Sequence, residues 1–203
     1  MTSGGTVFVV DDEEVMRDVL LTIFRESEVR CVTFASGAEF LESYQDPGPS
    51  CLLLDVRMPD MGGLEVQQCM KERGIRIPTI MVSGQADVAL AVEAMKAGAI
   101  DFVEKPFDWK QLLKMVSDQI EQDVGNRSTA SQRSTIAALH ETLTPRERQV
   151  AEQMVAGKPT KAIAADLGTA FNTVNNQRKS ILRKMQADSV VDLTRMLMTL
   201  YAD

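Results

Sequence analysis

The feature of this sequence that most constrains its fold is a regular alternation of short apolar runs with helical segments over the first 122 residues. The apolar runs are predicted to be strands, at 6–10, 30–34, 51–55, 78–82 and 101–103. The segments between and after them carry apolar residues at helical spacing, at about 13–27, 36–44, 63–73, 85–97 and 108–122. Strands that alternate with helices in this way predict an α/β fold with a doubly wound, five-stranded parallel sheet.

Charged residues stand where three of the predicted strands end. Asp11 and Asp12 follow the first strand, Asp55 closes the third, and Lys105 follows the fifth. The carboxyl ends of parallel strands form one edge of the sheet, where ligands bind, so we expect three carboxylates and one ammonium to converge there. Carboxylates packed together repel one another and need a cation, and oxygen-only ligands suit Mg²⁺. The pattern therefore predicts a magnesium site built for phosphoryl chemistry on an aspartate.

A simpler interpretation exists for each acidic residue taken alone, because acidic residues after strands are common helix caps. Asp12 could serve only as the cap of the helix that starts near Glu13. The joint occurrence of acidic residues at strand ends, together with a lysine, favours the functional interpretation.

The last 60 residues contain no strand pattern and predict a second, all-helical domain. Thr144 is placed to cap a helix, with Pro145 in its first turn and Glu147 able to bond back to the cap. That helix is expected to end near Val155. Three more helices are expected, at about 160–167, 172–185 and 190–200, with a tight glycine-containing turn before the third. This order predicts a small four-helix helix-turn-helix domain.

The chain therefore divides into an acidic sheet domain at 1–123, a polar linker at 124–139 and the helical domain at 140–203. Residues 1–122 carry 11 Lys/Arg and 21 Asp/Glu, whereas residues 123–203 carry 11 and 8. This asymmetry predicts different partners for the two parts, with nucleic acid favoured only for the basic part.

The three cysteines are scattered, which predicts reduced, buried thiols. The chain shows no signal peptide and no apolar run of membrane-spanning length, so we expect a cytoplasmic protein that does not bind membranes.

The stretches VFVVDDEEVMRD, CLLLDVRMPDMGGLE and IPTIMVSGQADVALAVEAMKAGAIDFVEKPF resemble the flavodoxin-like receiver domain of two-component response regulators. The stretches LTPRERQVAEQMVAGKPTKAIAADLG and TVNNQRKSILRKMQADSVVDLTRML resemble the LuxR-type helix-turn-helix. Together the two parts resemble the NarL/FixJ class of response regulators, closest to its FixJ branch.

The resemblance implies a phosphorylation site on the receiver. Asp55 is implied as the phosphoacceptor for a partner histidine kinase. Asp12 is implied to bind Mg²⁺ directly, together with Asp55 and the backbone carbonyl of Arg57, and Asp11 is implied to hold a metal-bound water.

The resemblance also implies a switch. Ser83 would hydrogen-bond the phosphoryl group, Lys105 would pair with one of its oxygens, and Phe102 would turn inward when Ser83 moves. The proline after the lysine, Pro106, is implied to follow a cis peptide bond.

On the helical domain, the resemblance implies a recognition helix at about 172–185 that enters the major groove. Some residues match groove-facing or backbone-contacting positions of the family, and others supply positive charge to the DNA phosphates. The residues expected to contact DNA are Lys161, Thr173, Asn175, Asn176, Arg178, Lys179, Arg183 and Lys184.

The start of this helix departs from the family pattern. The family usually has an Ile-Ser pair where this chain has Thr169-Ala170, which removes the usual capping serine. We expect Asn172 to cap the helix instead, so that the helix begins later.

The sequence thus predicts a regulator rather than an enzyme: phosphorylation by a sensor histidine kinase would promote a homodimer that binds double-stranded promoter DNA. One alternative is a signalling adaptor or phosphate sink that acts through protein partners, because the recognition helix is altered. A second is an aspartate-nucleophile phosphatase. Such enzymes typically place one residue between two aspartates and continue with Thr or Val, whereas here the two aspartates are adjacent and Glu13-Glu14 follows.

Overall fold

The first part of the chain is a five-stranded parallel sheet with helices on both faces, as the computed structural model shows for residues 4–27, 29–84 and 88–201. The strand order is β2-β1-β3-β4-β5, and all neighbouring pairs are parallel. The strands are β1 (Thr6–Val10), β2 (Arg30–Phe34), β3 (Ser50–Asp55), β4 (Thr79–Ser83) and β5 (Asp101–Glu104). The predicted fold class is therefore confirmed.

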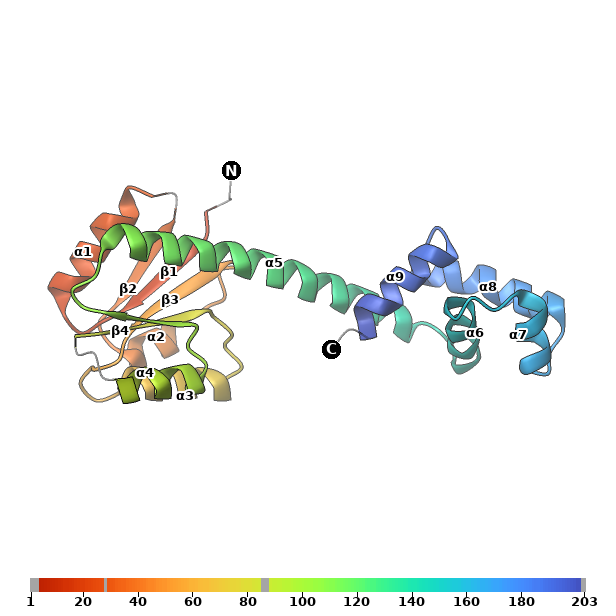
Figure 1. Cartoon of the computed structure of the whole chain (residues 1–203), viewed down its shortest axis with the longest axis horizontal. Coiled ribbons are helices and arrows are strands. Elements are labelled where there is room, and N and C mark those ends of the chain that lie inside the picture. The colour runs from red at the N-terminus through yellow and green to blue at the C-terminus, as the bar shows by residue number, and fades with distance from the viewer. Residues whose placement is uncertain (1–3, 28, 85–87, 202–203) are drawn as a thin grey trace. The chain divides into compact units, whose positions relative to one another are not determined.

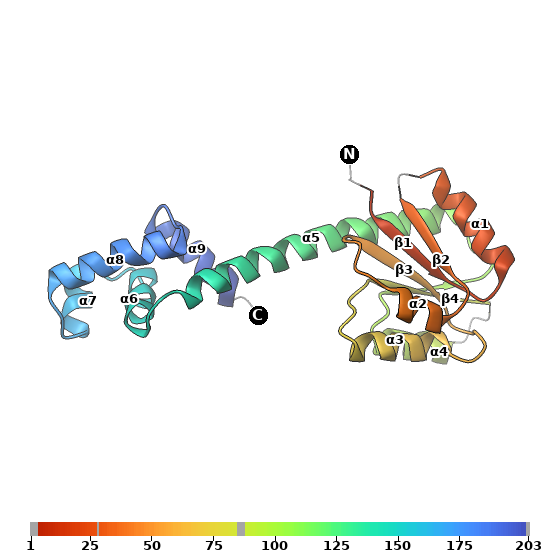
Figure 2. The ribbon, with the colours of Figure 1, turned by 180° about the vertical axis from the view of Figure 1, so that it is seen from behind.

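Helices cover the sheet in two layers, with α1 and α5 on one face and α2, α3 and α4 on the other (Figure 1, and from behind in Figure 2). Their bounds are α1 (Glu14–Arg25), α2 (Gly37–Ser43), α3 (Gly63–Glu72), α4 (Val88–Ala97) and α5 (Trp109–Glu141). The expected start of α4, at 85–87, lies outside the described residues. The order of the strands reverses between β1 and β3, and this switch point brings the ends of these two strands together.

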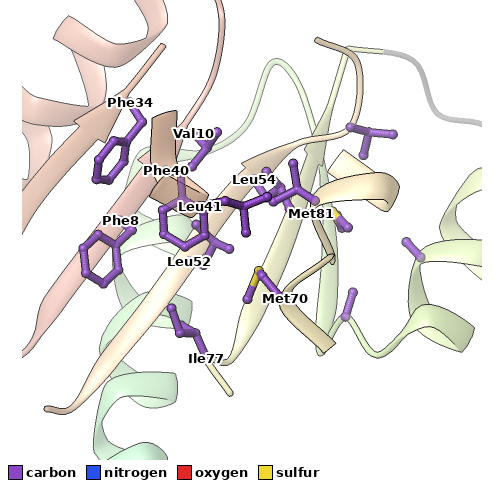
Figure 3. Close-up of a cluster of buried hydrophobic side chains, with 14 residues drawn as sticks. Phe8, Val10, Phe34, Phe40, Leu41, Leu52, Leu54, Met70, Ile77 and Met81 are labelled. Atoms are coloured by element: carbon purple, nitrogen blue, oxygen red, sulfur yellow. The ribbon is translucent and has the colours of Figure 1, made fainter. Parts of the chain in front are cut away.

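The three inner strands of the sheet are covered on both faces. Every residue of β1, β3 and β4 is buried, which is typical of inner strands of a parallel sheet. On the face of α2, α3 and α4, the rings of Phe8, Phe34 and Phe40 pack at centroid distances of 5.5 to 6.1 Å (Figure 3). Phe24 and Leu112 belong to the cluster on the opposite face.

Helix α5 does not end near residue 122, as its sequence pattern predicted, but continues to Glu141. Asp123 gives one reason, because its carboxylate is buried and accepts hydrogen bonds from Ser50 N–H at 3.0 Å and from Arg127 Nε at 2.6 Å. The same arginine reaches Asp46 at 2.9 Å. These contacts hold the helix beyond the predicted end, and residues that were predicted to form a linker are helical.

By internal contacts the chain divides into two compact units, at 1–127 and 128–203. The second unit contains the C-terminal part of α5 and four further helices, which pack around one apolar cluster. The four helices are α6 (Pro145–Val155), α7 (Thr160–Asp166), α8 (Phe171–Met185) and α9 (Val190–Tyr201). None of the described helices is long and apolar enough to cross a membrane.

The predicted start of α6 is confirmed. The Thr144 side chain accepts a hydrogen bond from Glu147 N–H at 3.2 Å, and the Glu147 carboxylate accepts one from Thr144 N–H at 2.9 Å. The predicted cap of α8 is wrong, because α8 begins at Phe171 and Ala170 occupies the cap position without a side-chain hydrogen bond.

Candidate functional site

Three carboxylates converge at the carboxyl edge of the sheet, where the sequence placed them. One oxygen from each of Asp11, Asp12 and Asp55 lies within 4.8 Å of the other two. Asp11 and Asp55 are buried, whereas Asp12 is exposed. The backbone N–H of Arg57 donates a hydrogen bond of 3.0 Å to Asp55 Oδ1, so the turn after β3 orients the Asp55 carboxylate.

Lys105 brings a positive charge into this cluster. Its ammonium lies 2.7 Å from Asp55 Oδ2 and 2.8 Å from Asp11 Oδ2, and its side chain is only 10% exposed. Burial lowers the pKa of Lys105, but the hydrogen bonds to Asp11 and Asp55 outweigh burial and leave the pKa raised. Burial is also the main reason why the pKa of Asp11 is raised, against the opposing effect of the hydrogen bond from Lys105. The lysine is therefore held in its charged form beside Asp55.

The donor set fits a hard divalent cation. Three carboxylates and one ammonium leave two formal negative charges uncompensated, and all ligand atoms offered are oxygens. The exposed Asp12 opens the cluster to solvent, where a cation can keep bound water.

Two residues that position the cluster were not predicted from the sequence. The Arg17 guanidinium donates to the carbonyl oxygens of Asp11 and Asp12, at 2.8 and 3.0 Å. Gly63 begins α3 against the end of β3, and a Cβ atom there would lie 2.4 Å from the carbonyl oxygen of Asp55. Arginine is common on helix surfaces, so nothing in the sequence singled out Arg17. The Gly-Gly pair that follows the third strand was a usable signal for Gly63.

The residues expected to form the switch lie near the cluster in the structure. Ser83 is fully buried at the end of β4, and its carbonyl oxygen accepts a hydrogen bond of 2.7 Å from Lys105 N–H. Phe102, on β5, is half-buried and packs against the core beneath α4. The peptide bond between Lys105 and Pro106 is cis, as expected.

In the second unit, α8 presents a polar face to solvent. Val174, Ile181 and Met185 are buried and face the core. Several residues expected to contact DNA are exposed, and these are Lys161, Thr173, Asn176, Lys179 and Arg183. Asn175 and Arg178 are half-buried.

Lys184, one of the residues expected to contact DNA, is paired within its own domain. Its ammonium lies 2.6 Å from the Glu147 carboxylate and 3.1 Å from the carbonyl oxygen of Thr142. Ser180 also donates to Glu147, at 2.8 Å. Burial opposes ionisation of Glu147, but these and other hydrogen bonds lower its pKa to about 2. Lys184 therefore ties α8 to α6 within the domain.

Comparisons with known proteins identify a family for both the sheet domain and the helical domain. Residues 7–117 match the response regulator receiver domain, and residues 141–197 match the bacterial regulatory proteins of the luxR family. Nodulation protein W of Bradyrhizobium diazoefficiens is 40% identical over 98% of this chain and 88% of its own length. Transcriptional regulatory protein FixJ of the same organism is 36% identical, over 98% of this chain and 97% of its own length.

Solved structures give the same result. The response regulator StyR is 34% identical with a TM-score of 0.86, over 96% of this chain and 98% of the StyR chain. Full-length FixJ from B. japonicum is 36% identical with a TM-score of 0.62, over 98% of each chain. A receiver domain followed by a LuxR-type helix-turn-helix defines a DNA-binding response regulator. The chain belongs to the FixJ-like response regulators.

Proposed function

We propose that Asp55 accepts a phosphoryl group from a phosphohistidine of a partner sensor kinase, and that this phosphorylation activates DNA binding. The observation that supports the proposal is the position of the buried Asp55 carboxylate, 2.7 Å from the Lys105 ammonium at the carboxyl edge of the sheet. A fixed cation placed where phosphoryl charge develops stabilises the transition state without reorganisation during the reaction.

The phosphoryl transfer needs little from the protein beyond in-line positioning of the reactants and neutralisation of the phosphoryl charge. An Asp55 carboxylate oxygen attacks phosphorus in line, an O–P bond forms, and the P–N bond to the donor imidazole breaks. The imidazole leaves with the electron pair of that bond and takes up a proton from water. Lys105 then pairs with a phosphoryl oxygen rather than with the Asp55 carboxylate. Asp12, Asp55 and the Arg57 carbonyl would hold Mg²⁺ directly, and Asp11 would hold a metal-bound water. The ion would neutralise the remaining charge of the phosphoryl oxygens.

Phosphorylation would be sensed by Ser83 and Phe102, which connect the site to the surface of α4. This helix carries a row of exposed apolar side chains at helical spacing, with Val88 80%, Val92 47% and Met95 47% exposed. An apolar row of this kind supports pairing of two receivers. A dimer would bring two copies of α8 to two DNA half-sites and raise the affinity by effective concentration.

Replacing Asp55 by Asn tests the proposal. The substitution keeps the shape of the side chain and removes the nucleophile, so we expect no base-labile and hydroxylamine-labile phosphate after incubation with Mg²⁺ and a small phosphodonor. Asp60→Asn is a matched control, because Asp60 is exposed and has a positive φ of 66°, which Asn tolerates. Normal phosphorylation of Asp55→Asn would overturn the site assignment.

The DNA output is tested by enrichment of genomic fragments with the phosphorylated protein. A sharp motif that Asp55→Asn fails to enrich would support a switchable transcription regulator. Equal or sequence-independent enrichment by both proteins would favour the alternative, in which the altered recognition helix leaves an adaptor or phosphate sink that acts through protein partners.

A further inference from the structure

The outward face of α8 contains one more polar residue than the resemblance to the family assigned to DNA. Asn172, Asn176, Lys179 and Arg183 follow one another at intervals of four, three and four residues, which places them on one side of a helix. All four are exposed. The buried residues Val174, Ile181 and Met185 lie on the opposite side. Asn172 is therefore the first member of a continuous polar row.

The amide of Asn172 is not used by the fold. The sequence favoured Asn172 as the helix cap, but the helix begins at Phe171, and Asn172 is its second residue. Throughout the described parts of the chain, no residue makes a hydrogen bond to the Asn172 side chain. A structural role for this side chain therefore has no support in its contacts.

The position of Asn172 suits contact with a base. In a helix-turn-helix, the N-terminal residues of the recognition helix are those that reach base edges in the major groove. An asparagine amide can pair with adenine through both N6 and N7. The rise of a helix puts Asn172 about 6 Å from Asn176 along the axis, which corresponds to roughly two base pairs. A contact from Asn172 would thus extend the sequence read by the rest of the row.

We propose that Asn172 is a specificity-determining residue that reads an adenine at one edge of each half-site. This inference rests on the proposed function, because it assumes that α8 enters the major groove of the DNA that the protein regulates.

Two substitutions separate base reading from helix stability. Asn172→Ala removes the amide. Asn172→Asp keeps the size of the side chain, and a carboxylate in the first turn of a helix is favourable. A carboxylate accepts a hydrogen bond from cytosine N4 and cannot pair with both atoms of adenine. Asn126→Ala is the control, because Asn126 is an exposed asparagine within α5.

The experiment is selection of bound duplexes from a random DNA library with the phosphorylated full-length protein and these three variants. We expect Asn172→Ala to lose an adenine preference of roughly tenfold at one position of each half-site. Asn172→Asp should shift that position toward cytosine, and Asn126→Ala should give the wild-type motif. An unchanged motif for both Asn172 variants would overturn the inference, and so would a uniform loss of affinity for all sequences, which would indicate a phosphate contact. If the wild-type protein and Asn126→Ala select no motif, the proposed function itself fails.

Discussion

Replacing Glu147 by Gln is expected to destabilise the second unit, because the carboxylate joins α6 to α8. Gln keeps the size of the side chain and can still accept a hydrogen bond from Thr144 N–H. It removes the negative charge that lies 2.6 Å from Lys184, whose side chain is only 29% exposed. The change therefore removes the negative charge of Glu147, while the amide oxygen can still accept the hydrogen bond of the helix cap.

The magnitude follows from the depressed pKa of Glu147, which falls from 4.5 to about 2 through its hydrogen bonds to Lys184, Thr144 and Ser180 together. A shift of this size corresponds to roughly 3 kcal/mol of stability for the ionised carboxylate as a whole, at 1.36 kcal/mol per pKa unit, and the ion pair with Lys184 contributes part of it. Because the folded pKa lies below the unfolded one, this stability is fully present above pH 4.5 and declines as the pH falls toward 2. Roughly 2 kcal/mol of it should be lost between pH 5 and pH 3.

Native-state hydrogen exchange at backbone amides of α6 and α8 measures this effect, since it reports the opening free energy of the second unit alone. We expect Glu147→Gln to lower that free energy by about 2 to 3 kcal/mol at pH 7 and to remove most of its dependence on pH between 5 and 3. Glu152→Gln is the matched control, because Glu152 is exposed on the same helix, and it should change stability by less than about 0.5 kcal/mol. A loss below about 0.5 kcal/mol for Glu147→Gln, or an unaltered pH dependence, would refute this reasoning.

Because Lys184 is paired with Glu147, we expect Lys184 and Lys179 of α8 to have different roles. Lys184→Met should lower the stability of the second unit and leave the salt dependence of DNA binding unchanged, because the ammonium is paired within the domain. Lys179→Ala should weaken DNA binding for all sequences and reduce the slope of log affinity against log salt by about 1. A reduced slope for Lys184→Met would return this residue to the DNA interface.

Three further changes test other contacts in the receiver. Lys105→Met should destabilise the receiver in EDTA, because the substitution leaves adjacent carboxylates without a positive partner. In thermal melts, millimolar Mg²⁺ should stabilise this variant more than it stabilises the wild type. Gly63→Ala should lower stability by about 1 to 3 kcal/mol and slow phosphorylation by a small phosphodonor, because the added methyl group meets the Asp55 carbonyl oxygen; normal rates and stability would contradict this packing. Asp123→Asn should speed hydrogen exchange in α5 beyond residue 120, because Arg127 loses its buried partner, and unchanged protection would show that the helix does not need this contact.

Local patterns were enough to predict most of the elements and the acidic cluster. The strands at 6–10 and 30–34 have the predicted bounds. A short run of apolar residues is enough to indicate a strand of a parallel sheet. The convergence of Asp11, Asp12 and Asp55 was also predictable, because the topology of a parallel sheet brings the carboxyl ends of its strands to one edge. The cap at Thr144 depends on residues only three apart.

Contacts between residues far apart in the chain were decided by the tertiary structure. Asp123 meets Ser50 across 73 positions, and Lys184 meets Glu147 across 37. No periodicity encodes such a pairing, so short-range patterns did not indicate that α5 continues past residue 122 or that Lys184 is paired with Glu147. The sequence by itself determined which residue types lie at each strand end and helix start, since these follow from short-range geometry. Only the folded structure determined which charged groups are already paired, because a buried charge takes whichever partner the packing of distant elements brings within reach.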